Sequence, residues 1–316
     1  MRVVVLGTSN SILRGGYADA LRQHPEVSDF LRIGPGGSTS VILPYFGMEV
    51  DFAAFDCAVI DTSVNDGAFL GWGLVSEDDI RCNVEWVCSQ AVQRGCVPLL
   101  LIMPNRTKLD VSDRAAAIYK EMAPDCGALV LDGYGFVERH CARSGTTGQE
   151  LFMDDLHLRA DVAVELVPDL LALCRHTQKR LSPDQPPQTG PVTDYRRIEA
   201  RALADDIILR RTSLLQVDCV ALAAEGRIRV GLEAGERLCG VVYNAAHSSG
   251  SLVFEGETRV ALNVRSAYFG EHELVVLARQ VSPAVAAQAG HVEIALQKSE
   301  GQAEIIGLLI KGGTPA

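Results

Sequence analysis

The sequence has no long hydrophobic run, since no apolar stretch approaches the roughly 20 residues that span a bilayer. It has 29 Lys and Arg against 40 Asp and Glu, a net charge of −11, and no basic cluster interrupts this acidic excess. A chain of this charge repels phosphate backbones and anionic lipid surfaces. We therefore expect neither nucleic acid nor a membrane as a partner.

Two further signals are missing. The N-terminus lacks the longer apolar stretch and small-residue cleavage site of a secretory signal. The nine cysteines form no C-x-x-C pair, and an odd number cannot all pair within one chain. We expect reduced thiols that fill the core, no structural metal and a cytoplasmic location.

The first 180 residues alternate short apolar runs with longer amphipathic ones, in a chain that is 47% hydrophobic. This alternation predicts a parallel sheet covered on both faces by helices, with strands too apolar to be half-exposed. The predicted strands are 3–6, 30–33, 57–61, 97–102 and 128–131, and the predicted helices include 12–24, 77–94, 112–122 and 161–174.

The second half has a different pattern. Residues 181–194, "LSPDQPPQTGPVTD", contain four prolines and almost no apolar residue, which is typical of an exposed linker. Residues 195–316 then show short, often alternating strands separated by turn residues. They predict an all-β sandwich or jelly-roll of about 120 residues. The predicted strands are 214–222, 227–232, 238–243, 251–254, 259–264, 273–278, 291–296 and 304–310.

Small polar residues follow the first strand in "VVVLGTSNSIL", at the edge where open α/β sheets bind ligands. Ser9 is a candidate nucleophile there, at the start of the next helix. Capping of that helix by Thr8, Ser9 or Ser11 is the alternative. A nucleotide-binding turn is a third option, but the later glycines of G-x-G-x-x-G are missing.

A serine nucleophile needs a base to take its proton. Of the seven histidines, His157 stands out because it lies in "FMDDLHLRADVAVEL", before the last helix of the first half. Asp154, three residues earlier, is placed to accept a hydrogen bond from the imidazole, whereas Asp155 is expected to point elsewhere. The other six, in contexts typical of surface or packing residues, are His24, His140, His176, His247, His272 and His291.

Two more segments at this edge offer donors for an oxyanion. In "IGPGGSTS", Gly37 allows a substrate to approach the backbone, and in "DTSVNDG", Asn65 can present its side-chain amide. Each segment also reads as an ordinary turn. Together they predict a polar cluster after the first three strands.

These segments resemble the four blocks of the SGNH (GDSL-type) hydrolases, which supply Ser, Gly, Asn and His in that order. The blocks are "LGTSNS", "GPGGSTS", "SVND" and "DDLH", and the resemblance covers roughly residues 1–178. Thr8 replaces the usual Asp before the nucleophile, and Ser63 replaces the Gly of G-x-N-D, which indicates a divergent branch.

The resemblance implies a flavodoxin-like three-layer sandwich with a five-stranded parallel sheet in residues 1–180. It also implies an esterase that needs no cofactor and no metal. By this resemblance, Ser9 is expected to attack the ester carbonyl, His157 to act as base and then acid, and Asp154 to orient His157. The resemblance also implies that the backbone N–H groups of Ser9 and Gly37 and the side chain of Asn65 hold the oxyanion.

The expected substrate is a small acylated molecule, with an O-acetyl saccharide as the leading candidate by analogy with similar bacterial enzymes. An O-acyltransferase with the same triad is the nearest alternative, and a non-catalytic carbohydrate-binding or scaffold protein is the alternative from another class. The candidate pocket residues are Thr8, Asn10, Ser38, Ser63, Asp66 and Trp72, the last in "LGWGL", which is either a pocket wall, a lid or a plain loop.

The predicted β domain is poor in aromatic residues. A flat platform for sugar stacking is available only around Tyr268 and Phe269. Packing or homo-oligomer formation through this domain is the alternative role.

Overall fold

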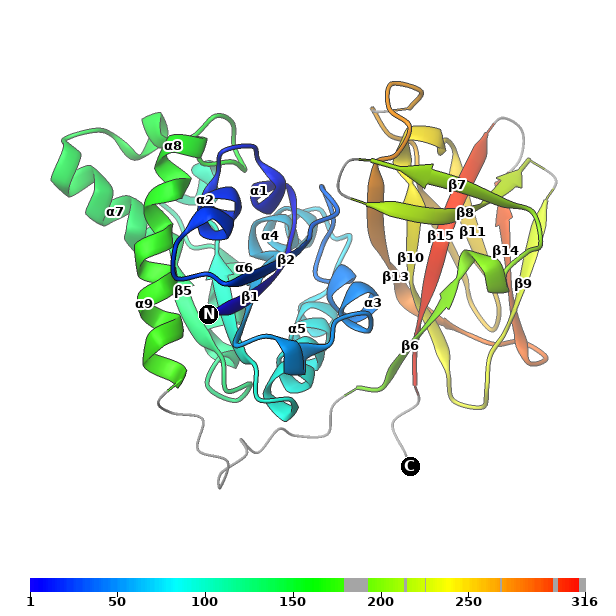
Figure 1. Cartoon of the computed structure of the whole chain (residues 1–316). Helices are drawn as coiled ribbons and strands as arrows, with labels where there is room; N and C mark the ends of the chain where they lie inside the picture. The colour runs from blue at the N-terminus through cyan, green and yellow to red at the C-terminus, as the bar shows by residue number, and fades with distance from the viewer. Residues whose placement is uncertain (179–192, 213–214, 225, 268, 298–300, 313–316) are drawn as a thin grey trace. The chain divides into compact units, whose positions relative to one another are not determined.

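The computed structural model describes residues 1–178, 193–212, 215–224, 226–267, 269–297 and 301–312 (Figure 1). The chain divides into two compact units, Met1–Val192 and Thr193–Ala316. The predicted linker, residues 181–194, lies outside the described residues except for its last two.

The first unit is built on one five-stranded sheet in which all neighbouring strands are parallel. The strand order is β2-β1-β3-β4-β5, which is the flavodoxin-like order. The expected fold class of this half is therefore confirmed. The strands are β1 (Arg2–Gly7), β2 (Asp29–Ile33), β3 (Cys57–Asp61), β4 (Val97–Ile102) and β5 (Leu129–Asp132).

Helices cover both faces of this sheet (Figure 1). Apolar residues of α2, α7 and α9 form one core with alternate strand residues such as Val3, Val59 and Leu101. On the other face, α4, α5 and α6 pack against one another and against β4. The helices are α1 (Ser9–Ile12), α2 (Tyr17–Gln23), α3 (Ile42–Gly47), α4 (Ser63–Gly71), α5 (Glu77–Gln93), α6 (Arg114–Met122), α7 (Gly133–Ser144), α8 (Ala160–Ala163) and α9 (Val167–Gln178).

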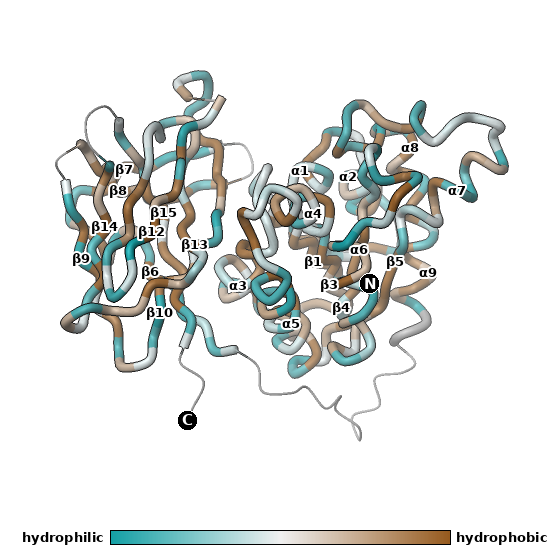
Figure 2. The backbone as a smooth tube through the Cα atoms, turned by 180° about the vertical axis from the view of Figure 1, so that it is seen from behind, coloured by the Kyte–Doolittle hydropathy of each residue, from teal (hydrophilic) through white to brown (hydrophobic). Residues whose placement is uncertain are grey.

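Two details of the predicted pattern were wrong. The helix expected over 12–24 is split into α1 and α2, because Gly15 adopts a φ of +70° that a continuing helix does not allow. The strands β2 and β5 are partly exposed rather than buried on both faces, because they lie at the two edges of the sheet. The central strands β1, β3 and β4 are buried along almost their whole length, and the strands of this sheet are largely brown in Figure 2.

The second unit contains two antiparallel sheets, which confirms the all-β expectation. One sheet has the order β13-β10-β15-β8-β7 with β6 also paired to β15, and the other has the order β12-β11-β14-β9. Their apolar faces share one core that includes Tyr243, Phe254 and Ile305. The strands are β6 (Tyr195–Glu199), β7 (Ile207–Arg211), β8 (Gln216–Ala223), β9 (Arg227–Gly231), β10 (Arg237–Asn244), β11 (Ser251–Glu255), β12 (Arg259–Asn263), β13 (Val276–Ala286), β14 (His291–Leu296) and β15 (Gln302–Lys311).

Two observations concern the cysteines and the helices of the described residues. Seven of the nine cysteine side chains are buried, as expected of small core residues, while Cys82 and Cys141 are partly exposed. Among the described helices, none has both the length and the apolar composition needed to cross a bilayer.

Candidate active site

Ser9 begins α1, directly after the turn that ends β1. The turn is tight, since a Cβ atom on Gly7 would lie 2.6 Å from the Ser11 side chain. Thr8 makes no side-chain capping bond to the helix, and the Ser11 hydroxyl donates back to the Thr8 carbonyl at 2.7 Å. The Ser9 hydroxyl is directed instead toward His157, with 2.6 Å between Oγ and Nε2.

His157 lies on a short loop that folds back on itself. Phe152 and Leu158 form a β-bridge, and the Met153 N–H donates to the His157 carbonyl at 2.9 Å. Inside this loop, Asp154 Oδ1 accepts the N–H groups of Leu156 at 2.8 Å and of His157 at 2.9 Å. The loop therefore has an internal hydrogen-bonded framework that fixes Asp154 and His157 relative to each other.

Asp154 also meets the imidazole itself. Both carboxylate oxygens lie 2.8 Å from His157 Nδ1, so Nδ1 carries the proton and Nε2 is the acceptor that faces Ser9. Partial burial acts to raise the pKa of Asp154, but the N–H of Leu156 and the imidazole of His157 outweigh it, and the pKa is lowered. The carboxylate is therefore charged near neutral pH, which suits it to stabilise an imidazolium.

The other two predicted segments come together beside each other. Asn65 lies in the first turn of α4 and its Nδ2 donates to the Ser38 carbonyl at 2.9 Å. An amide nitrogen carries two protons, so one N–H remains for another acceptor. Gly37, one residue earlier in the loop, is exposed and has a φ of +55°.

Asp66 binds the loop that contains Gly37 and Ser38 through the backbone of Ser40. Its side chain is fully buried, and it accepts the Ser40 N–H at 2.8 Å and the Tyr119 hydroxyl at 2.7 Å. Burial raises the pKa of Asp66 to about 7 although these two donors act to lower it. The structure thus places this candidate pocket residue inside a buried network, with both oxygens engaged.

Asp61, the last residue of β3, is a second buried carboxylate. Tyr17 donates to its Oδ2 at 2.8 Å, while Oδ1 has no hydrogen-bond partner among the described residues. Burial raises the pKa of Asp61 to about 7, and the Tyr17 hydroxyl only partly offsets it.

The remaining candidate pocket residues differ in exposure. Thr8, Ser38 and Ser63 are buried, and Ser63 Oγ accepts the Met103 N–H at 3.2 Å, which ties α4 to the end of β4. Trp72 is 65% exposed and packs on Phe69 with 5.3 Å between ring centres. It follows Asn65 by seven residues, so α4 carries it about 10 Å along the helix axis from Asn65.

Several contacts had no signal in the sequence. Asn10, which the sequence predicts only as a pocket residue, donates from Nδ2 to the Leu156 carbonyl at 3.0 Å. Arg106 pairs with Asp155, its guanidinium lying 2.5 Å from Oδ1, and its N–H donates to the Asp155 carbonyl at 2.8 Å. Asp155 thus points away from His157, as expected. Such pairings join residues far apart in the chain, which one sequence cannot reveal.

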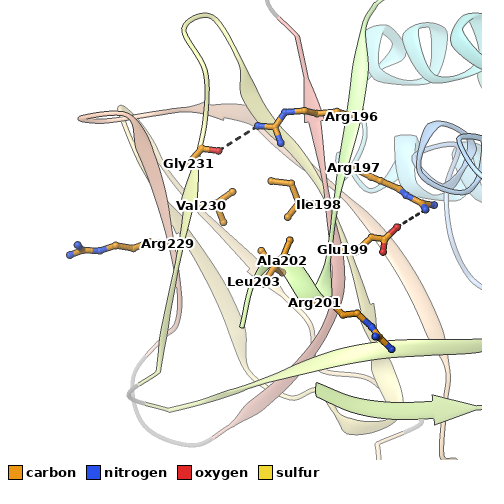
Figure 3. Close-up of a pocket in the computed structure, with 10 residues that line it drawn as sticks. All are labelled: Arg196, Arg197, Ile198, Glu199, Arg201, Ala202, Leu203, Arg229, Val230 and Gly231. Carbon is orange, nitrogen blue, oxygen red and sulfur yellow. Dashed lines mark hydrogen bonds and ion pairs between the residues drawn. The ribbon is translucent and has the colours of Figure 1, made fainter. Parts of the chain in front are cut away.

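The β domain contains a separate open groove of about 640 Å³ between β6 and β9 (Figure 3). Its lining includes the apolar side chains of Ile198, Leu203 and Val230. Its four arginines each pair with a carboxylate, so the groove offers neutralised pairs rather than a concentrated positive charge. The pairs are Arg196–Glu236, Arg197–Glu199, Arg201–Asp218 and Arg229–Glu293. Of the predicted stacking platform, Phe269 is 45% exposed and Tyr268 lies outside the described residues.

Among the described residues, no three His, Cys, Asp or Glu side chains lie close enough together to hold a metal ion.

The fold and the arrangement of Ser9, His157 and Asp154 define a class: an α/β domain with a flavodoxin-like parallel sheet and a Ser-His-Asp arrangement, followed by an all-β domain. Over its whole length the chain is similar to the crystal structure of a two-domain esterase, CEX, active on acetylated mannans. The TM-score is 0.70 at 13% identity, over 100% of this chain and 92% of that one. A structure of such an esterase co-crystallized with mannopentaose gives 0.67 at 14% identity, over 100% and 91%. No protein-family model and no curated protein matches the sequence.

Proposed function

We propose that this protein is a serine esterase that removes a small O-acyl group, with an O-acetyl saccharide as its substrate. One observation carries the proposal: the continuous chain from Asp154 through His157 to Ser9, with contacts of 2.8 Å and 2.6 Å. A serine hydroxyl becomes a useful nucleophile only when such a base is in reach and is itself oriented by a third group.

The proposed reaction uses this geometry. Nε2 of His157 takes the Ser9 proton as Oγ bonds to the ester carbonyl carbon, and the carbonyl oxygen becomes an oxyanion. The N–H groups of Ser9 and Gly37 and the second N–H of Asn65 are the donors for that oxygen. The imidazolium, stabilised by Asp154, then protonates the leaving alcohol, and the same histidine activates the water that releases the acid and restores Ser9.

The substrate class rests on the fold shared over the whole chain with an esterase whose known substrates are acetylated mannans. The co-crystallization of the second structure with mannopentaose supports a saccharide as the alcohol component. No cofactor enters the proposed reaction, because the residues of the site supply the nucleophile, the base and the oxyanion donors.

The test is covalent labelling with a fluorophosphonate probe, together with acetate release from acetylated mannooligosaccharides. We expect labelling of the wild type, and its loss in Ser9→Ala and His157→Ala. Acetate release should fall by about 10³-fold or more in both variants. Ser11→Ala is the matched serine control and should still be labelled, because its hydroxyl donates to the Thr8 carbonyl.

Two results would change the proposal. A folded wild type that is neither labelled nor active would leave the non-catalytic alternative. Acyl transfer to an added sugar in preference to water would identify the O-acyltransferase instead.

A further inference from the structure

Ser9 and His157 are separated by 148 residues, so their 2.6 Å contact depends on where the His157 loop rests on the sheet domain. The framework inside the loop, from the Phe152–Leu158 bridge to the Asp154 turn, sets its internal shape. It does not set the distance from the imidazole to Ser9. That distance needs contacts between the loop and the rest of the unit.

Besides the packing of Leu156 and Leu158 on the apolar core, two polar contacts hold the tip of the loop. Arg106 holds Asp155 by its guanidinium and by its N–H, and this pair is exposed to solvent. Asn10 holds Leu156 by an amide-to-carbonyl hydrogen bond of 3.0 Å, and Asn10 is only 3% exposed.

The hydrogen bond between Asn10 and Leu156 lies next to the contact between Ser9 and His157 in the chain. Asn10 follows Ser9 in α1, and Leu156 precedes His157, so the bond joins the same two segments that Ser9 and His157 join. Because both contacts join the same two segments, we expect a loop shift that lengthens one to lengthen the other.

The residue type also matters. The Leu156 carbonyl needs a donor, and an aspartate of the same shape would place an oxygen against it instead. Leu156 is half-buried, so a carbonyl that loses this donor would turn toward water or another donor, and the loop would shift with it. A shift of about 1 Å in a catalytic group is enough to reduce turnover by roughly 10²-fold.

We propose that Asn10 is a positioning residue that sets the distance between Ser9 and His157 by holding the His157 loop at the Leu156 carbonyl. This proposal rests on the proposed esterase function and names one more residue on which that function depends. In this role Asn10 positions His157 relative to Ser9 and does not contact the substrate.

The test compares Asn10→Asp and Asn10→Ala with the wild type in the full chain. The readouts are the rate of fluorophosphonate labelling, and kcat and KM for p-nitrophenyl acetate. We expect labelling and kcat to fall by about 10- to 100-fold while KM changes by less than about threefold, because substrate contacts remain. Asn10→Asp keeps the side-chain volume, so it gives a folded variant if Asn10→Ala does not.

Asn244→Ala is the matched control. Asn244 is also a buried asparagine whose Nδ2 donates to a backbone carbonyl, that of Glu273 at 3.0 Å, but it lies in the β domain. It should lower the melting temperature and leave the labelling rate unchanged, which separates positioning from general destabilisation.

The outcomes distinguish the two proposals. If the wild type is labelled and both Asn10 variants keep its labelling rate and kcat, the positioning role is wrong and the esterase proposal stands. If kcat stays and KM rises instead, Asn10 contacts substrate and the positioning role is again wrong. If the folded wild type shows neither labelling nor ester hydrolysis, the esterase proposal fails and the role of Asn10 fails with it.

Discussion

The His157 loop and the region from the end of β3 into α4 both contain aspartates, but the surroundings of their carboxylates differ. Asp154 has a 53% exposed side chain and accepts two backbone N–H groups and an imidazole. Asp61 and Asp66 are fully buried, and burial raises the pKa of each to about 7. The difference shows that charge at this site is decided by donors and solvent rather than by residue type.

The largest expected effect comes from Asp154→Asn. The amide keeps the shape and can still accept a backbone N–H, but it removes the charge and the fixed tautomer of His157. We expect kcat to fall by roughly 10²- to 10⁴-fold with little change in melting temperature. Ester hydrolysis and thermal unfolding measure the two effects. An activity above one tenth of the wild-type value would show that Asp154 does not act in the triad.

The variant Asp66→Ala tests how much the hydrogen bonds of a buried aspartate contribute to stability. It leaves the Ser40 N–H and the Tyr119 hydroxyl without their acceptor, and each such loss costs about 1–3 kcal/mol. We expect the free energy of unfolding to fall by roughly 2–5 kcal/mol, measured by urea denaturation. Asp66→Asn retains an acceptor and is the matched control. Equal stability of Asp66→Ala and the wild type would contradict the network.

The variant Asp61→Asn tests whether the buried Asp61 carboxyl is protonated in the folded state, through the pH dependence of stability. Between pH 3.8 and about 7 the unfolded carboxyl is ionised while the folded one keeps its proton. The folded state then binds more protons, so stability falls as pH rises, by up to about 1.4 kcal/mol per pH unit for each such group. The variant should show a shallower decrease than the wild type in denaturation between pH 5 and 7. Identical slopes would mean that Asp61 titrates normally.

Asp155→Asn should have the smallest effect. Asp155 stands next to Asp154, but its side chain pairs with Arg106 at the surface, and its backbone contact to Arg106 does not depend on the side chain. Exposed pairs contribute about 1 kcal/mol or less, so we expect a stability change within that range and an activity loss below about tenfold. A loss as large as that of Asp154→Asn would mean that the two aspartates share the role.

Local pattern was sufficient for much of the fold. The strands β1, β3 and β4 are continuous apolar runs, and a buried parallel strand requires that composition on both faces. The predicted boundaries of β3 and β4 coincide with those in the structure. The sequence did not predict five elements: the helices α3, α4 and α7 and the strands β6 and β7. Their runs of apolar residues are short or interrupted by charged residues, and the segments they pack against lie elsewhere in the chain.

By itself the sequence determined the succession of strands and helices, the change to an all-β pattern after the proline-rich stretch, and the polar residues that follow the strands. These are local properties, set by the period of apolar residues and by turn chemistry. Only the tertiary structure decided that Ser9 meets His157, that Asn10 holds Leu156, and that Asp66 is buried while Asp154 is not. Those facts depend on contacts between segments up to 148 residues apart, and burial and partners arise only when the chain has closed around them.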